Sequence, residues 1–223
     1  MIDHTLSLPH LVRKPQDVEA AEPPPLLLLL HGIGSNEHDL FSMGPHLDPR
    51  FLVVSARAPV EIMANGYGWF KVEFTPEGGI VPDLEQAEAS GQLVVRFIDE
   101  LVEAYGVAGR SVYLMGFSQG AMMSLGVALA RPDKVSKVVA MGGRLPEEAV
   151  SNAASVEEIS KLEVFVSHGI YDDVLPIANG RACRDRLEEL GVPLIYREYP
   201  MGHEVRAETL RDITGWLTST LDR

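Results

Sequence analysis

The pentapeptide Gly-Phe-Ser-Gln-Gly at residues 116–120 is the segment of this sequence best suited to covalent chemistry. An apolar run, residues 112–115, precedes it, and a helix-compatible run, residues 121–125, follows it. A serine in a tight turn between a strand and a helix exposes its hydroxyl above the sheet, and flanking glycines allow close backbone approach. The N–H groups that begin the helix then face the negative charge that develops in acyl transfer. The pattern therefore predicts that Ser118 is a nucleophile.

A nucleophilic serine needs a histidine that removes its proton and an acid that orients the histidine. The chain has seven histidines, and His203 lies in a Pro-Met-Gly-His loop just after the last apolar run that reads as a strand. Loops at the carboxyl ends of parallel strands gather at one edge of the sheet, so this loop can bring an imidazole over the serine. We therefore predict that His203 is the general base.

The acid is expected in the loop after the preceding strand, where Asp172 and Asp173 stand side by side. Adjacent side chains point in different directions, so only one of the two can orient His203, and their spacing leaves both open. Either aspartate would also serve to cap a helix that starts near Pro176, because Asp is favoured at that position.

A glycine-rich loop, residues 31–36, follows the first central run of leucines. Such a loop can present a backbone N–H to the oxyanion of a tetrahedral intermediate, and a second donor follows the nucleophile directly. The candidate donors are the backbone N–H groups of Ile33 and Gln119. A plain turn between a strand and a helix is the alternative for this loop.

The elements that must position these residues alternate between apolar strands and amphipathic helices, which favours an α/β fold with a mostly parallel central sheet and helices on both faces. The leucine run at 26–30 lacks alternation, as a strand buried on both faces does. Residues 5–12 are expected to add an edge strand. The other predicted strands are residues 51–55, 111–117, 137–141, 164–167 and 194–199. The predicted helices are residues 84–105 with Asp83 and Gln86 at capping-box spacing and Gly106 at the end, one after Ser118, 177–190 and 206–221.

Composition excludes several classes of protein. At 223 residues and 46% hydrophobic content, the chain (residues 1–223) is expected to form one domain. A net charge of −13 and a pI near 4.9 disfavour binding to nucleic acid or anionic membranes. The single cysteine, Cys183, indicates a reducing compartment, so a cytoplasmic protein is expected, and it reads as a small buried hydrophobe. No signal segment, spanning helix or stable membrane anchor is expected, because the apolar run at 26–30 is too short.

No cofactor and no metal are expected. The segment from His203 to Ala207 lacks the second histidine of H-E-x-x-H, and the sequence has no Cys/His cluster. The loop at residues 32–34 lacks the dinucleotide-binding pattern, and no G-K-[ST] motif is present.

Together these motifs resemble the phospholipase/carboxylesterase family of α/β-hydrolases, which includes acyl-protein thioesterases. The resemblance extends from about residue 26 to 217. It implies that the family's aspartate falls on Asp172 and its oxyanion donors on Ile33 and Gln119. The motifs that carry it are Leu30-His31-Gly32-Ile33-Gly34 with Asn36, Glu37, Asp39 and Leu40, the serine pentapeptide, His168-Gly169 with Asp172 and Pro176, and Gly202-His203.

The resemblance implies a serine carboxylesterase that cleaves a small-molecule ester through Ser118, His203 and Asp172, with thioesters and lysophospholipids as further substrates. Two positions depart from the family pattern: Lys71 stands where an aspartate often follows Trp-Phe, and Ala121 where a glycine is common. The alternatives are another acyl reaction on the same fold, such as perhydrolysis or lactone opening, or a non-catalytic binding module.

An apolar groove for esters of short to medium acyl chain is expected beside the serine, although loop packing is an equal alternative for its two aromatic residues. Its candidate residues are Ile33, Trp69, Phe70, Val174 and Leu175. The sequence leaves open the acyl chain, the leaving group, the structure of residues 144–161, and whether the protein is a monomer or a homodimer.

Overall fold

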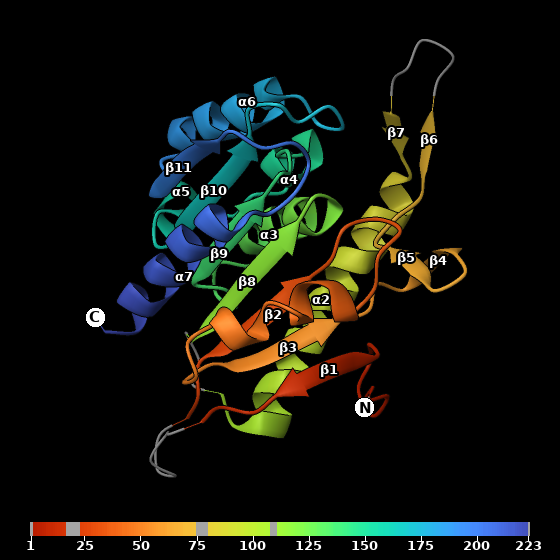
Figure 1. The fold of residues 1–223 in the computed structure, drawn as a ribbon, viewed down its shortest axis with the longest axis vertical. Helices are drawn as coiled ribbons and strands as arrows, with labels where there is room; N and C mark the ends of the chain where they lie inside the picture. The colour runs from red at the N-terminus through yellow and green to blue at the C-terminus, as the bar shows by residue number, and fades with distance from the viewer. Residues whose placement is uncertain (1, 17–22, 75–79, 108–110, 223) are drawn as a thin grey trace.

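A seven-stranded sheet forms the centre of the protein in the computed structural model, which describes residues 2–16, 23–74, 80–107 and 111–222 (Figure 1). The strand order is β1-β3-β2-β8-β9-β10-β11. β1 runs antiparallel to β3, and the remaining pairs are parallel. The strands are β1 His10–Arg13, β2 Leu26–Leu30, β3 Leu52–Ala56, β8 Val112–Phe117, β9 Lys137–Met141, β10 Glu163–Gly169 and β11 Leu194–Tyr199.

Helices cover both faces of the sheet, and the five leucines of β2 show how. Leu26, Leu28 and Leu30 belong to the apolar cluster that contains the inner sides of α2, α3 and α6. Leu27 and Leu29 belong to the opposite cluster, with α1 and α7. All five are fully buried, so the uniform leucine run reflects a strand covered on both faces. The longer helices are α2 Leu84–Tyr105, α3 Gln119–Ala130, α6 Ile177–Glu189 and α7 Ala207–Leu221; α1 is His38–Phe41.

The predicted core elements are present, with ends that differ by at most two residues. Helix α2 has the predicted bounds and ends at Gly106, which has a φ of 64°. Its capping box is only half formed: the Asp83 carboxylate accepts from the Gln86 backbone N–H at 3.0 Å. The Gln86 side chain accepts instead from the backbone N–H of Lys71. The glutamine thus ties the loop before β6 to the start of α2.

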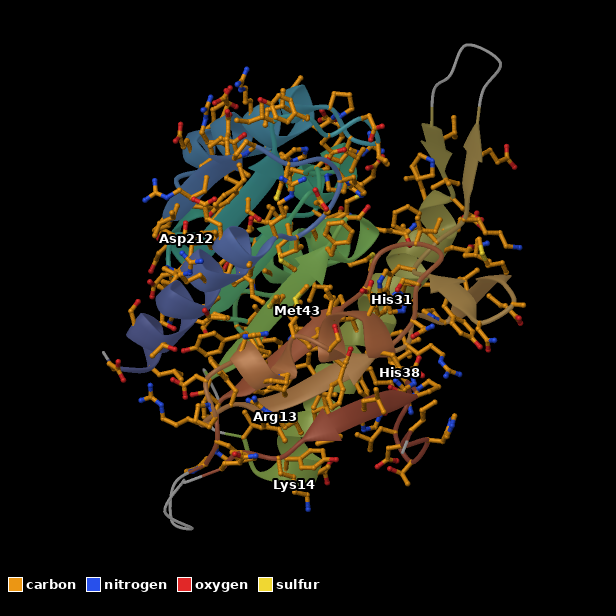
Figure 2. The ribbon with its side chains drawn as sticks, in the orientation of Figure 1. Arg13, Lys14, His31, His38, Met43 and Asp212 are labelled. Atoms are coloured by element: carbon orange, nitrogen blue, oxygen red, sulfur yellow. The ribbon has the colours of Figure 1, made fainter. Side chains whose placement is uncertain are left out.

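The edge strand lies later in the chain than the sequence predicted, at His10–Arg13 and not at residues 5–12. Residues before it turn back on themselves, since Asp3 and His10 exchange backbone hydrogen bonds. Pro9, which lacks an N–H, stands directly before the strand. Arg13, labelled in Figure 2, donates to the carbonyl oxygens of Gly44 and Asp48 and so fixes the loop before β3 to this edge.

Several short elements were not predicted. Two antiparallel pairs of short strands, β4 with β5 and β6 with β7, lie between β3 and α2. Their strands have three or four residues each, too few for a clear alternation of polar and apolar side chains. Residues 144–161, left open by the sequence, contain two short helices. These additional elements are η1 Gly44–His46, β4 Val60–Met63, β5 Gly66–Gly68, β6 Val72–Phe74, β7 Ile80–Pro82, α4 Glu147–Ser151 and α5 Val156–Ile159.

The strand order reverses at β2, whose neighbours are β3 on one side and β8 on the other. Open α/β sheets place their ligand sites outside the carboxyl ends of the strands at such a point. β2 and β8 are in register with Leu30 opposite Gly116, so the two loops that follow these strands start side by side.

Candidate active site

Ser118 occupies the sharp turn between β8 and α3. Its φ of 53° and ψ of −116° are unusual for a residue with a side chain. The turn requires glycine on both sides: a Cβ on Gly116 would lie 2.2 Å from the Gly120 carbonyl oxygen, and one on Gly120 would lie 1.9 Å from that of Leu30. The backbone is therefore held in a strained conformation by close packing of strand, helix and neighbouring strand.

Two hydrogen bonds join the serine, the histidine and one aspartate. Nε2 of His203 lies 2.9 Å from Ser118 Oγ, and Nδ1 lies 2.7 Å from Oδ2 of Asp172. A carboxylate only accepts hydrogen bonds, so Nδ1 carries the proton and Nε2 is left to accept from the serine hydroxyl. The His203 ring packs on Phe117, with a centroid distance of 4.8 Å. This arrangement can draw a proton from the serine during attack on a carbonyl carbon.

The loops that carry Asp172 and His203 are held together by their backbones. The N–H groups of Ile170 and Tyr171 donate to carbonyls of the chain that leaves β11, at 2.8 and 3.0 Å. At Gly169 a Cβ would lie 2.3 Å from the carbonyl oxygen of Gly202. The glycine is thus required for the two loops to approach.

The structure distinguishes the two adjacent aspartates by burial. Asp172 is buried, and its Oδ1 accepts from the backbone N–H groups of Val174 and Leu175 at 3.0 and 2.8 Å. Asp173 is exposed. The carboxylate of Asp172 therefore uses one oxygen to organise its own loop and the other to orient His203.

The loop after β2 lies against the serine turn. A Cβ on Gly32, the residue before Ile33, would lie 3.4 Å from the Cβ of Ser118, so this part of the loop packs closely on the serine turn. The Gly34 N–H that follows donates to the Tyr67 carbonyl and turns the loop. Gln119 begins α3, where the first N–H groups of a helix have no acceptor within the helix. Both sequence-predicted donors thus lie at the edge of the sheet that holds the serine.

His31, labelled in Figure 2, lies in the same loop, and its contacts indicate a structural role. It is fully buried, its Nδ1–H donates to the Gly32 carbonyl, and its Nε2 accepts from the backbone N–H of Ala58. Burial lowers the pKa of this imidazole, which matches a neutral ring with these two partners. His31 therefore stabilises the loop that carries Ile33.

The side chain of Gln119 has a second role that the sequence did not indicate. Its Oε1 accepts from the backbone N–H of Trp69 at 2.7 Å, and its Nε2 donates to the Phe70 carbonyl at 2.8 Å. The indole N–H of Trp69 donates in turn to the His31 carbonyl. One buried amide thus fixes the Trp-Phe loop to the serine turn, and neither motif spacing nor composition reveals this long-range pair.

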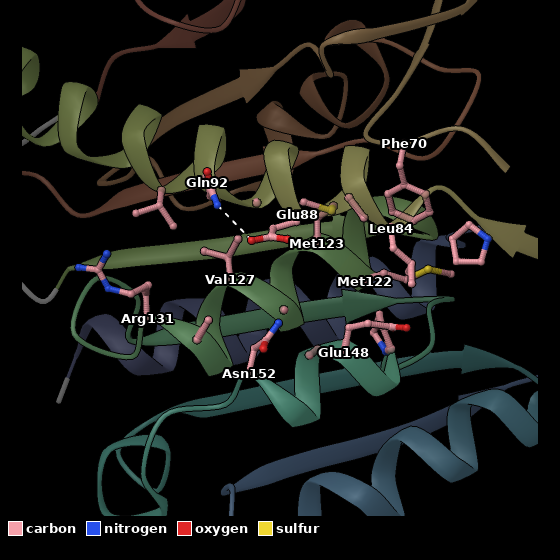
Figure 3. Close-up of a pocket in the computed structure, with 18 of the residues that line it drawn as sticks. Phe70, Leu84, Glu88, Gln92, Met122, Met123, Val127, Arg131, Glu148 and Asn152 are labelled. Carbon is pink, nitrogen blue, oxygen red and sulfur yellow. Dashed lines mark hydrogen bonds between the residues drawn. The ribbon is translucent and has the colours of Figure 1, made fainter.

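A cavity of about 650 Å³ lies between α2, α3 and α4 (Figure 3). Met122, whose backbone N–H donates to the Ser118 carbonyl, and Phe70 line the end that Figure 3 shows opposite Arg131. Ser118, His203 and Asp172 are not among the residues that line this cavity. The lining is mainly apolar, with Phe70, Pro82, Leu84, Ala87, Gly91, Val95, Met122, Met123, Gly126, Val127, Ala130, Pro146 and Ala149, and includes Glu88, Gln92, Arg131, Arg144, Glu148 and Asn152.

The five residues proposed for the groove differ in position. Trp69 is 0% exposed, and Leu175 is buried with both backbone groups engaged, so both have packing roles in this structure. Ile33 and Val174 are 37% and 54% exposed and can meet a molecule that approaches the serine. Phe70 lines the cavity. The sequence did not indicate that α3 lines a cavity. Its helix is apolar on all sides, a pattern that is typical of a buried helix.

Within the described ranges, no three His, Cys, Asp or Glu side chains form a group that could hold a metal ion. Of the helices in those ranges, none combines the length and the apolar character needed to cross a bilayer.

The mostly parallel seven-stranded sheet with helices on both faces is the α/β-hydrolase fold. Esterase PE8 has the same fold, with a TM-score of 0.80 and 28% identity over 96% of this chain and 98% of that one. A carboxylesterase from Mesorhizobium loti, 19% identical, has a TM-score of 0.82 with 98% of each chain covered, a likeness of fold alone.

Residues 16–221 match the family described as Phospholipase/Carboxylesterase. Esterase YpfH of Escherichia coli K12 is 34% identical over 193 residues, which cover 82% of this chain and 75% of that protein. Acyl-protein thioesterase 1 of Eremothecium gossypii is 28% identical over 214 residues, or 87% of each chain. The chain belongs to the phospholipase/carboxylesterase family, and it is a carboxylesterase of that family, as the sequence motifs predicted.

Proposed function

We propose that the protein hydrolyses carboxylic esters through a Ser118–His203–Asp172 triad and an acyl-enzyme intermediate. The observation that carries the proposal is the continuous chain of hydrogen bonds from the buried carboxylate through the imidazole to the hydroxyl, at 2.7 and 2.9 Å. The strained turn that presents the serine supports the same role.

In the first half of the proposed reaction, Ser118 Oγ attacks the ester carbonyl while its proton passes to Nε2 of His203. The carbonyl oxygen becomes an oxyanion and accepts from the N–H groups of Ile33 and Gln119. When the tetrahedral intermediate collapses, the C–O bond to the alcohol breaks and Nε2 returns the proton to the leaving oxygen. Asp172 remains ionised throughout and stabilises the transient imidazolium.

In the second half, a water molecule gives a proton to His203 Nε2 and attacks the acyl-serine carbonyl. Collapse of this intermediate breaks the bond to Ser118 Oγ, which regains its proton from the histidine, and the carboxylic acid leaves. Perhydrolysis and lactone opening share the first half, so they differ only in the nucleophile that enters or in the ring of the substrate.

For the substrate, we propose that the acyl chain enters the cavity between α2, α3 and α4. Its volume is that of a typical small-molecule pocket, and two methionines and Phe70 provide adaptable apolar contact next to the serine turn. Each methylene that fits adds about 0.8 kcal/mol, or roughly fourfold in kcat/KM. Monomeric esters of short to medium chain are the first candidates. Acyl thioesters and lysophospholipids come second, by likeness to a relative named as a thioesterase.

The chemistry is tested with Ser118→Ala and the matched control Ser151→Ala, an exposed serine at the end of α4. The first variant is expected to lose p-nitrophenyl ester hydrolysis by about 10⁴ or more and to escape fluorophosphonate labelling, while the control keeps both. Labelling of a different residue with Ser118 unmodified would refute the triad. A folded wild-type protein that is neither labelled nor active would favour a binding module.

The acyl site is tested with Gly126→Leu, because Gly126 lines the cavity and a Cβ added there would lie 3.8 Å from the Cβ of Ala149, an ordinary contact distance. We expect kcat/KM to fall for hexanoyl and longer esters while the acetyl ester is little changed. Gly215→Leu, at an open site on α7, is the control. An unchanged chain-length profile in Gly126→Leu would mean that the acyl chain lies elsewhere.

A further inference from the structure

We propose that His168 is a positioning residue for the catalytic carboxylate: it holds the loop in which Asp172 orients His203. The proposal rests on the triad proposed above. His168 is the second-last residue of β10. Among the described residues, no hydrogen bond joins its side chain to the serine or to the oxyanion loop, so it would act only through Asp172.

The imidazole of His168 is fully buried beneath the acid loop. Its Nε2 lies 2.7 Å from the carbonyl oxygen of Leu175 and 3.4 Å from Oδ2 of Asp172. Both neighbours are acceptors, so Nε2 carries a proton. Oδ2 of the aspartate therefore faces two imidazole N–H groups, that of His203 at 2.7 Å and that of His168 at the longer distance.

The contact with Leu175 fixes the residue whose N–H binds the aspartate. The Leu175 carbonyl accepts from His168, while its N–H donates to Oδ1 of Asp172 at 2.8 Å. Leu175 is thus held through both of its backbone groups, which keeps its N–H directed at Oδ1, and Oδ2 then stays directed at His203. Loss of the His168 donor would leave the buried Leu175 carbonyl unpaired and free this loop to shift.

The absence of a side chain at Gly180 of α6 leaves room for this ring. A Cβ on Gly180 of α6 would lie 2.6 Å from Cγ and 2.7 Å from Nδ1 of His168. Nδ1 is buried and has no hydrogen-bond partner among the described residues. Glu198, opposite His168 in the β10–β11 register, is engaged by Arg181 at 2.8 Å. A proton on Nδ1 would lack an acceptor, so the packing favours the tautomer that carries its N–H on Nε2.

The first experiment compares His168→Leu with His168→Gln on p-nitrophenyl esters. Leucine fills similar space but removes the donor, whereas the glutamine amide can place an N–H near the former Nε2. We expect kcat of His168→Leu to fall about 10- to 100-fold with KM nearly unchanged, because a misplacement of about 1 Å costs this much. His168→Gln is expected to recover most of that loss. A role in folding alone would lower stability without this selective loss of kcat.

A double-mutant cycle with Asp172→Asn gives the decisive test. If His168 acts through the aspartate, His168→Leu is expected to cost less than about threefold once Asp172 has been changed. If His168→Leu lowered kcat by the same factor in the Asp172→Asn background as in the wild type, the proposal would be overturned. A folded His168→Leu variant with wild-type kcat would overturn it as well, and the triad would stand if Ser118→Ala were still inactive.

Two further measurements apply even if His168→Leu does not fold. Gly180→Ala should displace the ring and lower kcat with KM retained, whereas Gly215→Ala, at an open position, should keep wild-type kcat. In wild-type protein labelled with ¹⁵N-histidine, NMR should assign the His168 proton to Nε2. A proton on Nδ1 in place of Nε2, or full activity in Gly180→Ala, would contradict the proposed role.

Discussion

Replacement of Asp172 by asparagine isolates the orientation of the proposed base, because the two side chains have nearly the same shape. The backbone N–H groups of Val174 and Leu175 both point at Oδ1, so an asparagine would keep its carbonyl oxygen there. Its NH₂ group would then face Nδ1 of His203 across 2.7 Å. Two donors cannot share this position, so the imidazole must move its proton to Nε2, where it can no longer accept from Ser118.

The magnitude follows from what the variant must give up to regain the active tautomer. Rotating the amide so that its oxygen faces His203 would leave two backbone N–H groups, one buried and one partly buried, against a donor. Each such unpaired group costs about 1–3 kcal/mol, which gives about 2–6 kcal/mol in total. Loss of the negative charge beside the imidazolium adds to this cost. We therefore expect kcat to fall by about 10³–10⁴, equivalent to about 4–5.5 kcal/mol.

The assay is steady-state hydrolysis of a p-nitrophenyl ester by Asp172→Asn, with circular dichroism and thermal unfolding as checks of folding. Asp173→Asn is the matched control, because that side chain is exposed and next in sequence. It is expected to stay within about threefold of wild type. An Asp172→Asn variant that kept more than a tenth of wild-type kcat, or a larger loss in Asp173→Asn, would refute the reasoning.

Three further predictions concern packing around the site. Gln119→Leu leaves the backbone groups of Trp69 and Phe70 unpaired, so it should destabilise the protein by about 2–5 kcal/mol in urea unfolding; an unchanged midpoint would contradict the clamp. Gly120→Ala cannot be accommodated against β2, and we expect an inactive or unfolded protein; wild-type kcat would disprove the steric argument. Burial raises the pKa of the Cys183 thiol to about 12, so it should resist a thiol reagent at pH 8 until urea unfolds the chain, and rapid native labelling would count against this.

Most of the central sheet could be predicted from the sequence because buried parallel strands and amphipathic helices leave local patterns. Two examples are the leucine run at residues 26–30 and the helix at residues 84–105, with its apolar stripe and its capping residues. Each pattern lies within one short segment of the chain, so it can be recognised without the fold. The short paired strands at residues 60–63 with 66–68 and 72–74 with 80–82 leave no such pattern, since three or four residues do not establish a period. The edge strand was placed too early because the turn that pairs Asp3 with His10 has no clear signal in sequence.

The sequence by itself determined the kind of chemistry and its order along the chain. A serine between glycines after a strand, two aspartates after a later strand and a histidine after the last one restrict the candidates to very few residues. At the level of the sequence, only the likeness to the family distinguished Asp172 from Asp173. The side chains of neighbouring loop residues have no fixed direction until the loop folds.

The tertiary structure decided which groups meet. Residues 118 and 203 are far apart in the chain, and their contact depends on close approaches such as that of Gly169 to the Gly202 carbonyl. The same holds for the hydrogen bonds of Gln119 to the Trp-Phe loop, for the burial of Trp69, and for the cavity along α3. These features arise from packing between elements distant in sequence, so no local pattern of residue types specifies them.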